Sequence, residues 1–292
     1  MRKRVLVNIE VALVNSFTID GKGGNPAGVV FNSDQLSDVQ KLKIAQAVGY
    51  SETAFVSHDD VADYGVSFFT TIGEVDFCGH ATLATFSIMH QKGVLPAGSY
   101  VQRTKAGMLS VTIESNGMVV MDQQLPQKIE CFSYQEISNV IGIESHILES
   151  TKLPIEVVST GLPDVIIPVP KGYLDVIEPD DKLIAAFCKR HKVVGFHVFE
   201  LCDQESKLTA SCRNFAPLFG ILEESATGSS SGALACYLTE HLALGNDYVF
   251  EQGRAMNCTS MITASVESNN SMVINVKVGG FASSIGTKVI RV

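Results

Sequence analysis

The fold is best predicted from one stretch, Glu74-Val-Asp-Phe-Cys-Gly-His-Ala-Thr-Leu-Ala-Thr-Phe-Ser-Ile-Met-His90. It begins with polar residues, passes through Gly79 and His80, and then continues without an acidic or basic residue other than histidine until Lys92. A helix that has no charged face is buried on most of its sides. The stretch therefore predicts a buried helix over residues 79–92.

The N-terminus of this helix is a candidate carboxylate-binding site. Amide N–H groups in the first turn have no acceptor within their own helix, and the helix dipole favours a negative charge beside them. Cys78 and His80 add a thiol and an imidazole at the same place. A second stretch, Ser225-Ala-Thr-Gly-Ser-Ser-Ser-Gly-Ala-Leu-Ala-Cys-Tyr-Leu238, repeats this pattern of small residues before an apolar helix. Two such helix N-termini predict an anion site with two sides.

The predicted elements occur twice in the same order. A Gly-x-Pro turn leads into an apolar strand within residues 24–31 and again within residues 160–169. Each strand is followed by an amphipathic helix, predicted over residues 36–48 with Ser33 or Asp34 as its cap and again over residues 181–190. Further strands and a buried helix then follow. Four matching elements in sequence indicate an internal duplication. We expect an α+β fold of two pseudo-symmetric halves, residues 1–125 and 126–279, each with a curled, mostly antiparallel sheet around a central helix. The two helix N-termini would then face each other across a cleft.

Composition and charge exclude several classes of function. The 292 residues are 46% hydrophobic and carry a net charge of -9. No cluster of Lys and Arg interleaves with aromatic residues, which argues against binding to nucleic acid or to an anionic membrane. No apolar run reaches the roughly 18 residues of a membrane-spanning helix. We interpret residues 3–17 as a first strand rather than as part of a signal peptide.

The cysteines and histidines show no metal-binding spacing. There are seven cysteines, an odd number, and no C-x-x-C pair. Scattered single cysteines are typical of a reducing compartment, so we expect a cytoplasmic protein. We expect no metal site and predict structural or surface roles for His58, His90, His146, His191, His197 and His241.

Five short motifs lie in order along nearly the whole chain. They are Gly24-Asn-Pro-Ala-Gly-Val-Val30, Ser51-Glu-Thr-Ala-Phe-Val56, Phe77-Cys-Gly-His-Ala-Thr-Leu-Ala-Thr85, Arg213-Asn-Phe-Ala-Pro217 with Gly220-Ile221, and Ala226-Thr-Gly-Ser229 with Gly232-Ala-Leu234. In these motifs the chain resembles the PhzF-like isomerases of phenazine biosynthesis, which share the diaminopimelate-epimerase fold. The resemblance implies cofactor-free proton shifts on a small carboxylate substrate, a homodimer, and a C-terminal strand at about residues 280–292 that returns to the first half.

The resemblance also implies roles for individual residues. Glu52 matches the acid/base glutamate of the family, and His80 matches its motif histidine. Glu224 stands where the family usually has aspartate, so the charge is kept and one methylene is added. We expect Glu224 to be a catalytic residue that, with His80, positions or protonates the substrate. At a helix N-terminus we expect a lowered pKa for His80, which favours a neutral imidazole that can donate or relay a proton. The expected substrate-binding residues are Asn25, Gly79, Ala81, Thr227, Gly228 and Ser229.

Two other hypotheses remain. The first is a racemase or epimerase of the same fold that uses Cys78 as one base. Such epimerases use a thiol at each helix N-terminus, but the second position here is Ser225, whose hydroxyl is too weak a base for carbon. This favours Cys78 as a small packing residue. The second is a non-catalytic descendant that binds a metabolite or a protein partner.

Overall fold

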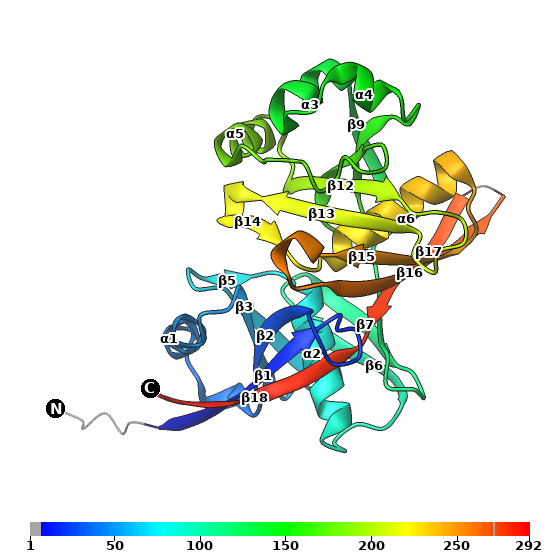
Figure 1. Ribbon diagram of the computed structural model, residues 1–292. Coiled ribbons are helices and arrows are strands. Elements are labelled where there is room, and N and C mark those ends of the chain that lie inside the picture. Colours follow the sequence, from blue (N-terminus) through cyan, green and yellow to red (C-terminus); the bar gives the residue numbers. More distant parts are fainter. Residues whose placement is uncertain (1–6, 271) are drawn as a thin grey trace. The chain divides into compact units, whose positions relative to one another are not determined.

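The computed structural model describes residues 7–270 and 272–292, which divide into two compact units. Unit 1 contains the described residues up to Met121 together with Gly280–Val292, and unit 2 is Asp122–Gly279. Strand β18 (Ala282–Arg291), red in Figure 1, pairs antiparallel with β1 (Asn8–Ser16), so the last strand belongs to unit 1. Residues 3–6 of the predicted first strand lie outside the described residues.

Unit 1 wraps a mixed sheet around one helix. Its strands pair in the order β18, β1, β2, β3, β4, β6, β7, β8; the pairs β2/β3 and β4/β6 are parallel, the others are antiparallel, and the short β5 pairs with β4. The further elements are β2 (Asn25–Val30), the 3-10 turn η1 (Ser33–Gln35), α1 (Asp38–Val48), β3 (Glu52–Ser57), β4 (Tyr64–Phe69), β5 (Glu74–Val75), α2 (Gly79–Gln91), β6 (Gly98–Thr104), β7 (Gly107–Ile113) and β8 (Val119–Asp122).

Unit 2 repeats this plan. Its strands pair in the order β9, β10, β11, β12, β13, β15, β16, β17, with β11/β12 and β13/β15 parallel, and β14 pairs with β13. The elements are β9 (Gln127–Phe132), α3 (Tyr134–Ile141), α4 (Ser145–Glu149), β10 (Ile155–Ser159), β11 (Pro163–Pro168), α5 (Asp181–His191), β12 (Gly195–Leu201), β13 (Ala210–Ala216), η2 (Pro217–Phe219), β14 (Ile221–Glu224), α6 (Gly228–Leu242), β15 (Asp247–Gln252), η3 (Arg254–Met256), β16 (Ser260–Asn269) and β17 (Met272–Gly280).

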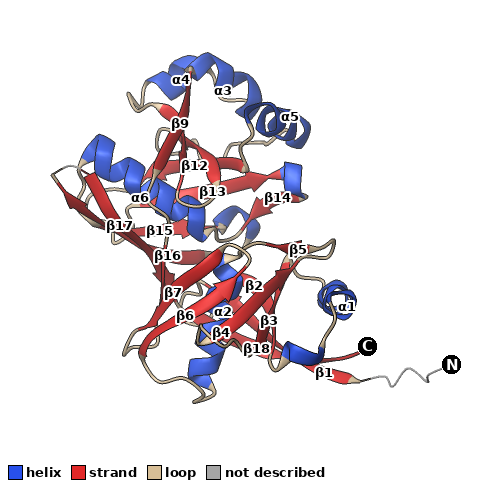
Figure 2. Cartoon of the chain, turned by 180° about the vertical axis from the view of Figure 1, so that it is seen from behind, coloured by secondary structure: helices blue, strands red, loops and turns tan. Residues whose placement is uncertain are grey.

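The two parallel pairs of each unit confirm the internal duplication. Parallel neighbours need a crossover connection, which is usually a helix. In unit 1, α1 lies between β2 and β3 and α2 between β4 and β6; in unit 2, α5 and α6 occupy the same places in the order of elements. In Figure 2 the helices α3, α4 and α5 lie together, apart from α6. The predicted α+β class is confirmed.

Helix α2 is buried along almost its full length, as its sequence predicted. Every residue from His80 to Met89 is buried, and the helix packs against β1, β2, β3, β7 and β18. Burying a side chain such as Leu83 or Phe86 contributes about 2 to 3 kcal/mol each by transfer from water. Helix α6 is buried in the same way in unit 2. No helix within the described residues is long and apolar enough to cross a membrane.

The starts of the surface helices follow local capping. We expected α1 to begin near Leu36 with Ser33 or Asp34 as its cap, and this was wrong. Ser37 caps the helix in a reciprocal capping box with Gln40, and residues 33–35 form the separate turn η1. Strands β5, β9, β10 and β14 and helix α4 were not predicted, because each has at most six residues, too few to establish a period.

Candidate active site

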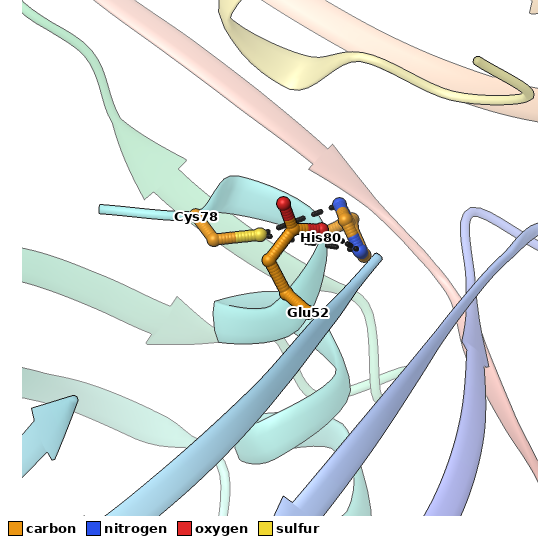
Figure 3. A group of neighbouring side chains, drawn as sticks. All are labelled: Glu52, Cys78 and His80. Carbon is orange, nitrogen blue, oxygen red and sulfur yellow. Dashed lines mark hydrogen bonds and ion pairs between the residues drawn. The ribbon is translucent and has the colours of Figure 1, made fainter. Parts of the chain in front are cut away.

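The side chains of Glu52, Cys78 and His80 lie together at the start of α2 (Figure 3). Glu52 and His80 are the predicted catalytic residues, and Cys78 is the base of the alternative epimerase hypothesis. Glu52 is the first residue of β3, Cys78 is the N-cap of α2, and His80 is the second residue of that helix. Oε2 of Glu52 lies 3.3 Å from Nε2 of His80. The Cys78 sulfur lies 3.4 Å from Nδ1 and 3.9 Å from Nε2 of the same imidazole. The arrangement joins a carboxylate, an imidazole and a thiol in one group.

All three side chains of this group are largely withdrawn from water. The exposed fractions are 9% for Glu52, 8% for Cys78 and 5% for His80. Burial lowers the pKa of His80, and the negative charge of Glu52 opposes this effect more weakly. The predicted direction of the shift is therefore confirmed, but its main cause is burial rather than the helix dipole. A neutral imidazole beside the carboxylate is the expected state near pH 7.

Two serines support His80 and were not predicted. The Ser16 hydroxyl donates a hydrogen bond of 2.6 Å to the carbonyl oxygen of His80. The Ser51 hydroxyl lies 3.5 Å from Nε2 of the His80 ring. Ser51 adjoins Glu52 in a recognised motif and could have been suspected. Ser16 is 64 residues from His80, and no local pattern links the two residues.

The strands β1 and β2 bring Ser16 and Asn25 to the same place. Asn25, the first residue of β2, is buried and pairs with Ser16 at the end of β1. The preceding Gly24 has φ +89°, and a Cβ there would lie 2.6 Å from the Ser16 carbonyl oxygen. Only glycine fits this turn without moving the backbone. The Gly-x-Pro motif therefore places Asn25, rather than acting as a flexible loop.

The first turn of α2 holds the two other predicted binding residues of unit 1. Gly79 is the first helical residue and Ala81 is the third. The helical hydrogen bonds begin with the amide of Thr82, which donates to the Cys78 carbonyl at 3.0 Å. The amides of Gly79 and Ala81 come before that bond, so they belong to the set that a helix cannot satisfy by itself.

Glu224 lies in a second polar group in unit 2. The Thr227 hydroxyl donates to Oε2 of Glu224 at 2.9 Å. Gln252 stands behind both residues: its amide nitrogen donates to the Glu224 carbonyl at 2.7 Å and to the Thr227 hydroxyl at 3.0 Å. Its Oε1 accepts from the Thr227 amide at 3.2 Å. Gln252 is fully buried and carries no sequence signal, so it was missed.

The remaining predicted residues of unit 2 start α6. Gly228 is the first helical residue and Ser229 is the second, and the Ser229 carbonyl accepts a hydrogen bond of 2.9 Å from the Thr160 hydroxyl. The next residue, Ser230, donates to the buried carboxylate of Asp164. Burial raises the pKa of Asp164 to about 6, although the Ser230 hydrogen bond opposes this. The start of α6 is thus anchored by polar contacts inside unit 2.

Comparisons with known proteins agree with this description. Residues 14–287 match the family model of phenazine biosynthesis-like proteins, PhzC-PhzF. The chain is 33% identical to the uncharacterized isomerase YddE of Escherichia coli strain K12, over 94% of this chain and 95% of YddE. It is 27% identical to trans-2,3-dihydro-3-hydroxyanthranilate isomerase of Pseudomonas chlororaphis, over 94% and 96% of the two chains.

A solved structure confirms the fold. The crystal structure of the PhzF-family phenazine biosynthesis protein of Bacillus anthracis is similar to this chain with a TM-score of 0.89 and 28% identity, over 97% of this chain and 99% of that one. The predicted PhzF-like, diaminopimelate-epimerase-like fold is therefore confirmed. Sequence, fold and family model agree: the chain belongs to the PhzC-PhzF family and is an isomerase of that family.

Proposed function

We propose that the protein catalyses a proton shift on a small carboxylate metabolite, with Glu52 as the acid/base group. One observation carries the proposal: Glu52 is buried, yet within the described part of the chain its Oε2 accepts no hydrogen bond. A carboxylate held by several protein donors has its lone pairs occupied. The Glu52 oxygen keeps a lone pair that can take a proton from carbon.

His80 and the start of α2 complete the proposed chemistry. Glu52 takes a proton from a carbon next to an unsaturated or carboxyl group, and the electron pair moves into the conjugated system. The same proton returns to a different carbon, so the double bond moves and no cofactor is consumed. The neutral His80 donates or relays a proton. The amides of Gly79 and Ala81 bind the substrate carboxylate, where they stabilise the charge that develops during the shift.

The other predicted residues extend the proposal to binding. In unit 1, Asn25 is a further binding residue beside Ser16. In unit 2, Thr227, Gly228 and Ser229 form an anion-binding group at the start of α6, and Glu224 orients Thr227 through their 2.9 Å hydrogen bond. The relative from Pseudomonas chlororaphis is named for a substrate that carries a carboxylate, which supports this substrate class.

Solvent-deuterium exchange tests the role of Glu52. A panel of small unsaturated carboxylates, including trans-2,3-dihydro-3-hydroxyanthranilate, is incubated with the protein in deuterated buffer, and incorporation is followed by mass spectrometry. We expect Glu52→Gln to reduce incorporation by about 10²- to 10⁴-fold while the far-ultraviolet circular dichroism spectrum is unchanged. The control is Glu10→Gln, an exposed carboxylate on β1, which should exchange like the wild type. Undiminished exchange in Glu52→Gln refutes the assignment.

A second candidate is a Cys78-dependent epimerase. The thiol lies 3.4 Å from the His80 ring, which an inert packing residue would not require. Epimerisation moves a proton between the two faces of one carbon and leaves the double bonds in place. Cys78→Ala separates the two functions: the isomerase proposal expects exchange to survive, and the epimerase needs the thiol.

A further inference from the structure

The group Glu52, Cys78 and His80 has the donor atoms of a zinc site. One ligand atom from each residue can be chosen so that the three lie within 4.8 Å of one another. We propose that this group binds a thiophilic divalent cation such as Zn²⁺, and that the bound ion inhibits the isomerase. The inhibition, though not the binding, rests on the proposed role of Glu52.

The distances in the group suit a tetrahedral ion. Bonds of about 2.0 to 2.3 Å from zinc to nitrogen, oxygen and sulfur set neighbouring ligand atoms about 3.3 to 3.6 Å apart. Nε2 of His80 is 3.3 Å from Oε2 of Glu52 and 3.9 Å from the Cys78 sulfur. The first distance fits already. The second distance, and the distance between the Glu52 carboxylate and the Cys78 sulfur, which is within 4.8 Å, both require the Cys78 side chain to move towards the ion.

The charges in the group also favour a cation. Within the described residues, Glu52 forms no ion pair with a lysine or an arginine, and its 3.3 Å contact is with the neutral imidazole of His80. An isolated buried carboxylate is costly unless a cation or several hydrogen bonds compensate it. Zn²⁺ displaces the proton of the Cys78 thiol into solvent, so a thiolate and a carboxylate then balance the two positive charges. This set leaves one position of a tetrahedral ion for water or a substrate oxygen.

A bound ion would stop the proposed reaction for a simple reason. Coordination occupies the Glu52 lone pair that receives the substrate proton, and it also occupies a ring nitrogen of His80. Binding of Zn²⁺ and proton transfer are therefore mutually exclusive. Sequence spacing predicted no metal site, because Glu52 starts β3 whereas Cys78 and His80 lie at the start of α2, so the three residues form no contiguous motif.

Cobalt spectroscopy tests the site without any need for turnover. The full-length reduced protein is titrated with Co²⁺, and we expect a thiolate-to-cobalt charge-transfer absorption that Zn²⁺ removes by competition. Cys78→Ser should lose this absorption. Glu52→Gln should keep it, with affinity at least about 10-fold weaker, because a neutral amide oxygen is a poorer ligand than a carboxylate. Absence of the absorption in the wild type, or its survival in Cys78→Ser, would overturn the proposal.

Cys131→Ser is the matched control. Cys131 is exposed, and its sulfur lies 3.9 Å from Glu156, which is itself 2.7 Å from His241. Cys131 thus has a glutamate and a histidine nearby, as Cys78 does. Its glutamate, however, already forms an ion pair with Lys128. This variant should keep the wild-type absorption; its loss would place the cation at Cys131 and overturn the proposal.

Thiol protection and inhibition give independent readouts. Zn²⁺ should slow alkylation of Cys78 by iodoacetamide at least 10-fold, as measured by peptide mass spectrometry, and Cys131 should be unaffected. In the exchange assay, Zn²⁺ should abolish incorporation and a chelator should restore it. If Glu52→Gln still exchanged deuterium, the proposed function would fail while the cobalt result would still decide the site.

Discussion

The buried imidazole of His197 should make unit 2 sensitive to acid. His197 lies in β12 and is fully buried. Its Nδ1 accepts a hydrogen bond of 3.2 Å from the Asn214 side chain, and Nε2 has no partner among the described residues. Burial lowers the pKa of His197 to about 3, from 6.5. Protonation inside the folded unit is therefore strongly disfavoured.

The sign of the effect follows from proton binding. Between about pH 3 and 6.5 the folded state binds fewer protons than the unfolded state, so the free energy of unfolding falls as the pH decreases through this window. At pH 5, which is about 1.5 units below 6.5, His197 therefore lowers the free energy of unfolding by about 2 kcal/mol. Asp164 acts in the opposite direction. Burial raises its pKa to about 6, so the folded state favours its protonated form. Lowering the pH from 6 to 5 therefore raises the contribution of Asp164 to the free energy of unfolding by about 1 kcal/mol.

Thermal unfolding of His197→Gln tests this reasoning. Melting temperatures are measured by far-ultraviolet circular dichroism at about pH 7.5 and pH 5. We expect the acid-induced drop in melting temperature to be smaller in the variant by about 4 to 8 °C, because 1 kcal/mol corresponds to about 2 to 4 °C in a unit of this size. Asp164→Asn should enlarge the drop by about 2 to 4 °C.

The comparison of the two pH values separates titration from packing. His197→Gln also alters a buried contact, but that change affects the melting temperature at both pH values. The control is His58→Gln, whose side chain is 78% exposed, and it should match the wild type. An equal acid-induced drop in His197→Gln and the wild type would refute the argument.

Two further substitutions test how the fold holds unit 2 together. Arg213 makes a two-pronged ion pair with Glu223, at 2.9 Å for each contact, and also donates to the carbonyls of Leu174 and Ile177. Arg213→Lys should lower the free energy of unfolding by about 2 kcal/mol or more, measured by urea denaturation, because lysine lacks the planar fork; an unchanged midpoint would contradict this. In β12, a Cβ on Gly195 would lie 2.3 Å from the Phe215 carbonyl oxygen, whereas one on Gly73 meets nothing within 4 Å. In the same experiment, Gly195→Ala should therefore lower the free energy of unfolding by about 1 to 3 kcal/mol, and the control Gly73→Ala by less than about 0.5 kcal/mol. Equal losses in the two variants would contradict this, because they would mean that the strand backbone moves to accommodate the added Cβ.

Much of the fold could be predicted because its signals are local. The stretch from His80 to Met89 has no acidic, lysine or arginine residue, and the helix it forms is buried at every one of these positions. Gly49 ends α1 with φ +81°, as a C-terminal glycine commonly does. The helix boundary at Ser37 was missed because several polar residues before it could serve as a cap, and only the hydrogen bonds with Gln40 distinguish among them.

Some residues of the candidate site could be predicted from local motifs, and others could not. Glu52, Cys78 and His80 were singled out from short motifs, since each motif is contiguous in sequence. Ser16 and Gln252 could not be found in this way. Each acts through a hydrogen bond to a residue on a distant element, His80 for Ser16 and Thr227 for Gln252. Such contacts exist only after the sheets have formed, and the hydrophobic period of the sequence does not predict them.

Local patterns in the chain are enough to predict the duplicated α+β plan, the two buried helices and the residues at their N-termini, because hydrophobic period, capping and small-residue patterns act over a few residues. Which side chains share an environment depends instead on how distant elements pack. The parallel pairing of β2 with β3 brings Glu52 to the N-terminus of α2. Burial there lowers the pKa of His80, and the same packing brings a thiol, an imidazole and a carboxylate within 4.8 Å of one another. Those distances depend on contacts between elements far apart in the chain, which pattern and composition do not encode.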